Sequence, residues 1–268
     1  MARQLKAVLF DFDDTLIDWS GVTLGWRQIE AERLDRVLRF LNRRLSPTGI
    51  ALEQLVKRYT ERTRDAWMIA RANLRAPVMP IILQQTLTEL GVSEADAFAD
   101  EILSAYDWKV VPGTVVFPDV FPVLDELRSR RIRLGVVTNS SQPMSLRDCE
   151  LREHSLLPYF PDCRLAAADV GYLKPHPRIF HSALERIGVA PDEAVFIGDN
   201  PIADVGGALG VGMRAVQRLV GDVSRSGGHL KLDADSYNAY GGHPCVNSFE
   251  ELPALLDDWY PDWRDGSA

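Results

Sequence analysis

The sequence is poor in cysteine and has no long hydrophobic run. Its three cysteines, Cys149, Cys163 and Cys245, are an odd number without paired spacing, which argues against a disulfide framework or a zinc site. No apolar run approaches the length of a membrane span. The first apolar run is only a few residues long and ends in acids, unlike a signal peptide. These absences predict a cytoplasmic protein with reduced thiols and no membrane partner.

An excess of positive charge is also missing. The formal net charge of the 268 residues is -8, with a pI near 5.2, and this acidity argues against a general nucleic-acid-binding protein. Hydrophobic residues make up 46% of the chain, enough for one large domain or for a core domain with a smaller companion. The sequence contains no internal repeat.

The most informative stretch lies near the start, where a short apolar run ends in acids. Residues Ala7–Phe10 read as a strand buried on both faces, as in a parallel sheet. Asp11 and Asp13 are two residues apart, so in extended chain their side chains leave on the same side. Two such groups suit a hard cation such as Mg2+, and one could act as a nucleophile and the other as a proton carrier. The alternative is a simple acidic turn after a strand.

Residues 20–108 show four helical patterns with short links and no strand signal between them. Apolar residues recur at steps of three and four, and Pro or Gly residues interrupt the pattern at the links. Ser93 is expected to cap the fourth helix. The block therefore predicts an all-α helical bundle, inserted as a cap domain into a chain whose remaining pattern is different. The expected helices cover residues 23–45, 52–76, 78–90 and 93–106.

Outside this block, buried strands alternate with amphipathic helices. This alternation predicts an α/β core with a doubly wound parallel sheet, a Rossmann-like architecture built from residues 1–19 and 109–268. Residues 221–242 are polar and Gly-rich and are expected to form a long surface loop. Further strands are expected at 132–137, 164–168, 194–197, 213–216 and 245–246, with helices at 119–130, 146–154, 178–187 and 251–259.

Polar residues follow the ends of the other buried strands as well. Thr138 and Asn139 end the second strand, Lys174 lies in the loop after the third, and Asp199 and Asp204 follow the fourth. In a parallel sheet these ends lie along one edge, where open α/β sheets bind ligands. Carboxylates, a cation, a hydroxyl and free amides together suit phosphoryl transfer, because they bind metal, neutralise phosphate charge and supply a nucleophile.

The same segments resemble the haloacid dehalogenase superfamily. Asp-Phe-Asp-Asp-Thr-Leu, Val-Val-Thr-Asn, Lys-Pro and Gly-Asp-Asn-Pro-Ile-Ala-Asp occur in the order seen in that family. The resemblance covers residues 5–18 and 110–217, and the inserted helices look like the family's cap domain of the first type. Four ordered motifs are far more specific than any one of them.

The resemblance implies a role for each motif residue. Asp11 would be the nucleophile that forms an aspartyl-phosphate, and Asp13 would protonate the leaving group and then activate water. Asp199 would bind Mg2+ together with the Asp11 side chain and the main-chain carbonyl of Asp13. The remaining residues would bind phosphate or support the site: Thr138, Asn139, Lys174 and Asp204.

These roles predict a Mg2+-dependent phosphatase that acts on a small phosphorylated metabolite. Asp13 favours this activity over dehalogenation, since an ester leaving group needs a proton and a halide does not, and the family's dehalogenating members lack an acid at this place. A phosphomutase also needs the second acid, but its motif often resembles Asp-x-Asp-Gly, whereas Asp14 and Thr15 follow here. A binding protein that has lost turnover is the alternative from another class.

Two linkers are expected to join the cap to the core and to act as hinges. They lie near Ile17–Gly21 and Trp108–Thr114. Trp19, inside the first linker, is equally compatible with lining the substrate pocket and with packing between core and cap.

Overall fold

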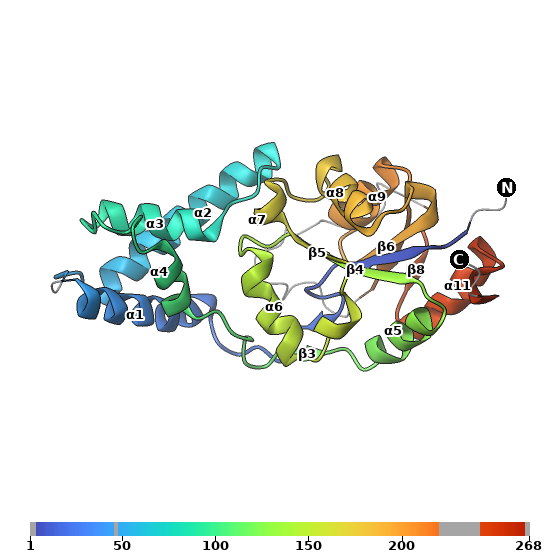
Figure 1. Ribbon diagram of the computed structural model, residues 1–268, viewed down its shortest axis with the longest axis horizontal. Helices are drawn as coiled ribbons and strands as arrows, with labels where there is room; N and C mark the ends of the chain where they lie inside the picture. Colours follow the sequence, from blue (N-terminus) through green and yellow to red (C-terminus); the bar gives the residue numbers. More distant parts are fainter. Residues whose placement is uncertain (1–3, 46–47, 220–241, 266–268) are drawn as a thin grey trace.

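The centre of the molecule is a parallel sheet of six strands in the order β5-β4-β1-β6-β7-β8. The computed structural model describes residues 4–45, 48–219 and 242–265 (Figure 1). The predicted loop 221–242 therefore lies, but for Gly242, outside the described residues. Among the described residues, no helix combines the length and hydrophobicity that crossing a membrane requires. The strands of the large sheet are β1 (Ala7–Phe10), β4 (Arg133–Thr138), β5 (Cys163–Ala166), β6 (Ala194–Gly198), β7 (Arg214–Arg218) and β8 (Cys245–Val246).

Strand β1 lies in the middle of the sheet because both of its faces are apolar. Val8 and Phe10 belong to a core cluster with helix α5, whereas Ala7 and Leu9 belong to the cluster with helix α8 on the other face. Helices therefore cover both faces, as the predicted doubly wound fold requires. The helices of the core are α5 (Val120–Ser129), α6 (Met144–Glu153), α7 (Ala167–Val170), α8 (Pro177–Ile187), α9 (Gly207–Gly210) and α11 (Leu252–Trp259).

The inserted block forms a helical cap, defined here as α1–α4, on one side of the core (Figure 1). Its interior is a separate hydrophobic cluster with residues from all four helices. The predicted helical insert is confirmed, but the fourth helix begins at Ala99 instead of near Ser93. Turns occupy residues 93–98, where the Ser93 hydroxyl donates to the Glu94 side chain instead of capping a helix. The cap helices are α1 (Trp26–Arg44), α2 (Leu52–Asn73), α3 (Met79–Glu89) and α4 (Ala99–Tyr106).

A second difference concerns the end of β5. The strand stops at Ala166, and α7 begins at Ala167, although the apolar run predicted a strand to residue 168. The Asp169 carboxylate accepts bonds from the main-chain N–H groups of Ala166 and Met144. The bond from Ala166 favours a helical turn directly after the strand, because it satisfies an N–H group that would otherwise need a strand partner, and the bond from Met144 satisfies an N–H in the first turn of α6.

The two linkers between core and cap lie side by side. Strand β2 (Ile17–Asp18) pairs antiparallel with β3 (Val115–Val116). Beyond this pair, Gly21 and Gly113 approach so closely that a Cβ atom on either would overlap the carbonyl oxygen of the other. Both linkers therefore leave the core together, and their role as hinges stays a prediction.

The turn between α2 and α3 seats the cap on the core through main-chain hydrogen bonds. The N–H of Leu173 donates to the carbonyl of Leu74 at 2.8 Å, and the N–H of Ala76 donates to Gly171 at 3.1 Å. The N–H of Met79 donates to Ser141 at 2.8 Å. The cap therefore contacts the loops that follow β4 and β5, at the carboxyl edge of the sheet.

Candidate active site

The strand order of the sheet reverses between the neighbouring strands β1 and β6. The chain runs from β1 outward through β4 and β5, then returns to β6 and continues outward through β7 and β8. Doubly wound sheets bind ligands outside the carboxyl ends of their strands at such a reversal. Asp11 follows β1 and Asp199 follows β6, so both carboxylates lie at this point.

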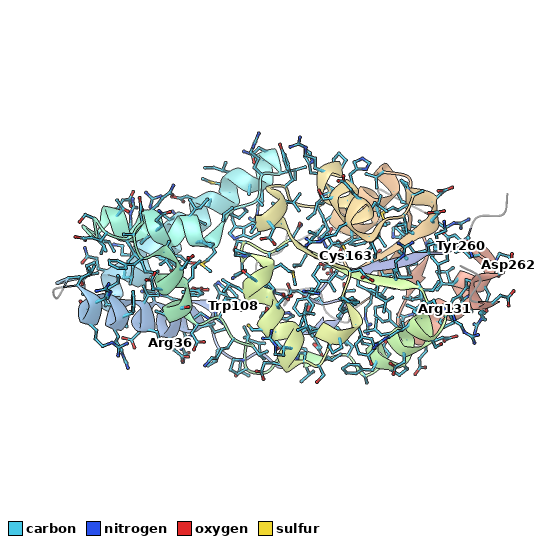
Figure 2. The ribbon with its side chains drawn as sticks, in the orientation of Figure 1. Arg36, Trp108, Arg131, Cys163, Tyr260 and Asp262 are labelled. Atoms are coloured by element: carbon cyan, nitrogen blue, oxygen red, sulfur yellow. The ribbon has the colours of Figure 1, made fainter. Side chains whose placement is uncertain are left out.

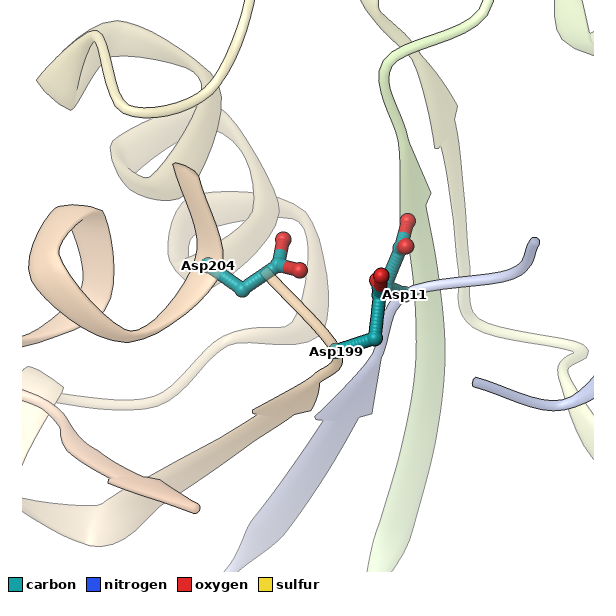
Figure 3. Close-up of side chains that lie close together, drawn as sticks. All are labelled: Asp11, Asp199 and Asp204. Carbon is teal, nitrogen blue, oxygen red and sulfur yellow. The ribbon is translucent and has the colours of Figure 1, made fainter. Parts of the chain in front are cut away.

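Three aspartates converge there (Figure 3). Asp11, Asp199 and Asp204 each bring one carboxylate oxygen to within 4.8 Å of the others. Burial, with Asp204 and Asp11 beside it, raises the pKa of Asp199 well above its ordinary value. Burial also raises the pKa of Asp204 to about 6, although Lys174 opposes this change. Hard, negatively charged oxygens at this spacing are the donor set that Mg2+ or a similar cation takes, so the residues fit a metal site.

Lys174 is the cation inside this cluster. Its Nζ lies 2.6 Å from Asp11 Oδ1 and 2.6 Å from Asp204 Oδ1, and it donates to the carbonyl of Val137 at 2.9 Å. Burial alone would lower the pKa of Lys174, but the Asp11 and Asp204 carboxylates raise it above its ordinary value. Lys174 is therefore fixed as an ammonium ion between the Asp11 and Asp204 carboxylates.

Asp204 reaches the cluster from the turn after β6. Its second oxygen accepts the main-chain N–H of Asn200, and the Asn200 side chain accepts the N–H groups of Ile202 and Ala203. Gly198 makes room for this carboxylate, because a Cβ at that position would overlap the Asp204 side chain. Since both Asp204 oxygens are engaged, Asp11 and Asp199 are better placed as metal ligands, and Asp204 holds Lys174.

Thr138 and Asn139 lie at the end of β4, beside Asp11. Thr138 is the last residue of the strand and is buried. Asn139 donates from its amide to the carbonyl of Lys174 at 3.1 Å and accepts the N–H of Lys174 at 2.7 Å. The Asn139 side chain thus holds the Lys174 backbone, while Thr138 offers the hydroxyl of the set.

Asp13 is separate from this acidic cluster. A tight turn follows β1, with Asp14 in the left-handed region at φ 57°. The Asp13 carboxylate accepts Arg147 Nη2 at 2.7 and 2.9 Å and Trp19 Nε1 at 3.0 Å. Two carboxylates two residues apart therefore have different partners: Asp11 an ammonium shared with Asp204, and Asp13 a guanidinium and an indole.

Arg147 is the residue that sequence reasoning missed. It lies on α6 with a side chain only 4% exposed, and its Nε is 2.9 Å from Glu150 Oε2. Burial would lower the pKa of Arg147, but Asp13 and Glu150 raise it. One feature of the sequence could have pointed to Arg147. An arginine and a glutamate three residues apart lie on the face of α6 that also carries the apolar Met144 and Leu151.

Comparison with known proteins shows the family to which the chain is similar. The profile of the haloacid dehalogenase-like hydrolase family matches residues 5–212. A glyceraldehyde 3-phosphate phosphatase of Methanopyrus kandleri is 27% identical over 213 residues, which are 80% of this chain and 83% of that protein. A phosphoserine phosphatase of Thermus thermophilus is 31% identical over 231 residues, covering 79% and 88%. The crystal structure of a 2-haloacid dehalogenase from Pseudomonas syringae superposes with a TM-score of 0.58 at 26% identity, covering 96% and 100%.

Proposed function

The chain belongs to the haloacid dehalogenase-like hydrolases, and we propose that within this family it is a Mg2+-dependent phosphatase of small phosphorylated metabolites. Relatives named as phosphatases act on different compounds, glyceraldehyde 3-phosphate and phosphoserine. The likeness to a haloacid dehalogenase structure is of comparable strength to these relationships. The choice between the two reactions therefore depends on the residues of the site.

The observation that carries the proposal is the second carboxylate, Asp13. An alkoxide leaving group needs a proton as its bond to phosphorus breaks, whereas a halide leaves as a stable anion. Asp13 lies two residues from Asp11 and is held outside the acidic cluster by Arg147 and Trp19. A carboxyl group in this place serves an ester substrate and has no task in carbon–halogen cleavage.

In the proposed reaction, Asp11 attacks phosphorus and forms an aspartyl-phosphate. Lys174, paired with Asp11, neutralises charge on the phosphoryl group, and the Thr138 hydroxyl donates to one of the phosphoryl oxygens. Asp13 gives a proton to the leaving oxygen and later takes one from the water that hydrolyses the intermediate. Asp11, Asp199 and the main-chain carbonyl of Asp13 would hold Mg2+, which supplies charge stabilisation for the transferred group.

The test is hydrolysis of p-nitrophenyl phosphate by the purified chain, with Mg2+ and with EDTA. We expect turnover with Mg2+, loss of turnover with EDTA, and a trapped phospho-enzyme that Asp11→Asn abolishes. A panel of phosphorylated metabolites then identifies the substrate. Halide release from 2-haloacids without phosphate release from any ester would replace the proposal with dehalogenation, and neither activity would favour a binding protein.

A further inference from the structure

The Asp13 carboxylate is held by two donors that the family motifs do not include. Arg147 comes from helix α6 and Trp19 from the first linker, and together they engage both carboxylate oxygens. A side chain with such partners has one preferred position. Proton transfer is sensitive to that position, because a donor must lie within hydrogen-bond reach of the leaving oxygen.

Arg147 is in turn fixed from several sides. Glu150 pairs with its Nε at 2.9 Å, and its guanidinium carbon lies 4.8 Å from the centre of the Phe12 ring. Both Arg147 and Glu150 have side chains only 4% exposed. Buried charges that lose a partner are costly, so each member of this set constrains the next.

The set continues across the boundary between core and cap. Trp108, in the second linker, lies at this boundary (Figure 2), and the guanidinium of Arg33 on α1 lies 3.8 Å from the centre of a Trp108 ring. Cys149, which lies between Arg147 and Glu150 on α6, donates from its Sγ to the main-chain carbonyl of Trp108 at 3.0 Å, and Arg33 donates to the carbonyl of Lys109 at 3.3 Å. Arg33 pairs with Glu30 at 3.6 Å, and Tyr106 donates to Glu30 at 2.6 Å.

Paired charges thus lie on both sides of Trp108, and we call them together the charge chain: Asp13, Arg147 and Glu150 on the core side, and Arg33 and Glu30 on the cap side. Its first three members belong to the core and its last two to the cap. Moving the cap away would draw Arg33 from Trp108, which contacts α6 beside Arg147 and Glu150.

We propose that Arg147 is a positioning residue for Asp13, and that the charge chain makes this position depend on the seating of the cap through Arg33. The inference rests on the proposed phosphatase activity. It differs from the role of Lys174, which acts on Asp11. It predicts that changes in Arg147, Glu150 or Arg33 impair proton donation to the leaving group more than phosphoryl transfer itself.

The experiment compares kcat/KM for p-nitrophenyl phosphate and for an alkyl phosphate that the wild type hydrolyses. An aryl leaving group needs little protonation, so a misplaced acid lowers the alkyl reaction selectively. Arg147→Met should lower the alkyl/aryl ratio by about 10- to 100-fold, part of the contribution of a general acid. Arg147→Lys should restore part of the ratio, and Arg33→Met and Glu150→Gln should lower it by roughly 3- to 10-fold.

The control is Arg218→Met. Arg218 Nη2 contacts Asp119 at 2.9 and 3.0 Å, the same two-oxygen geometry as Arg147 on Asp13, and Asp119 also accepts bonds from the Ser248 hydroxyl and the main-chain N–H of Phe249. The Arg218→Met variant should lower the stability of the fold without changing the alkyl/aryl ratio of kcat/KM. An unchanged ratio in folded Arg147→Met, or in Glu150→Gln if Arg147→Met does not fold, would overturn the positioning role.

The variants also distinguish failure of the link to the cap from failure of the proposed function. An unchanged ratio in Arg33→Met, with a lowered ratio in Arg147→Met or Glu150→Gln, would overturn the link to the cap. A wild type that hydrolyses neither ester would refute the proposed function instead.

Discussion

Replacing Lys174 with methionine should destabilise the fold strongly, because Lys174 is the cation inside the aspartate cluster. Its Nζ lies 2.6 Å from both Asp11 and Asp204, and its side chain is 2% exposed. Methionine keeps most of the volume but leaves two buried carboxylates without their counter-charge. Removing one partner of a buried ion pair costs about 3–5 kcal/mol, so we expect a loss of this size in the free energy of unfolding at pH 7. For a chain of this length the melting temperature should fall by roughly 10 °C.

The pH dependence of this loss tests its electrostatic origin. Burial raises the pKa of Asp204 to about 6 even with Lys174 present, and without the ammonium that pKa must rise further. As the pH falls from 8 to about 6, Asp204 becomes neutral in the variant while it is still largely ionised in the wild type, so the variant no longer needs the cation. The difference in unfolding free energy between wild type and Lys174→Met should therefore shrink toward acid pH.

Urea unfolding at pH 5, 6, 7 and 8, in EDTA to keep metal from replacing the ammonium, measures this difference. Arg218→Met is the matched comparison, since Asp119 has a pKa below its ordinary value and stays ionised over this range. A loss below about 1 kcal/mol at pH 7, far less than breaking a buried pair costs, would refute the reasoning. So would a loss for Lys174→Met that does not change with pH.

Three further predictions follow from the site and its supports. Asp199→Asn should raise the Mg2+ concentration needed for half-maximal hydrolysis or abolish turnover, with an unchanged far-ultraviolet circular dichroism spectrum; activity at the wild-type Mg2+ requirement would contradict this role. Burial raises the pKa of Glu150 from 4.5 to about 7, so its contribution to stability is present below pH 4.5 and is lost as the pH rises through 7. Glu150→Gln should flatten this part of the stability profile by roughly 3 kcal/mol, and parallel wild-type and variant profiles would argue against it. Gly198→Ala should displace Asp204 and destabilise the fold in urea, whereas Gly210→Ala, with open space around its Cβ position, should be tolerated.

The convergence of the motif residues could be predicted from the sequence. Each apolar run is short and ends in polar residues, and a parallel sheet brings all such ends to one edge. The structure places Asp11, Lys174, Asp199 and Asp204 together as this reasoning requires. The helical character of the insert was equally accessible, because its apolar residues keep a helical period over long segments.

The partners of Asp13 could not be predicted in the same way. Arg147 is 134 residues from Asp13 in the chain, and no local pattern links a residue in α6 to the turn after β1. Only the packing of α6 against that turn brings them together. The late start of α4 and the early end of β5 have local causes, Ser93 with Glu94 and Asp169 with Ala166, but each depends on a side-chain hydrogen bond that competes with the regular pattern.

The seating of the cap has a consequence for how such a protein can change. The bonds that join the turn between α2 and α3 to the core involve only main-chain N–H and carbonyl groups, at Leu74, Ala76 and Met79. Such bonds do not depend on the identity of the side chains, apart from the exclusion of proline at a donor position. Substitutions along the cap helices can therefore accumulate without loosening this attachment. A cap from a relative with another substrate could be joined at the two linkers, where β2 pairs with β3, and could still make these main-chain bonds, so one core can receive different caps.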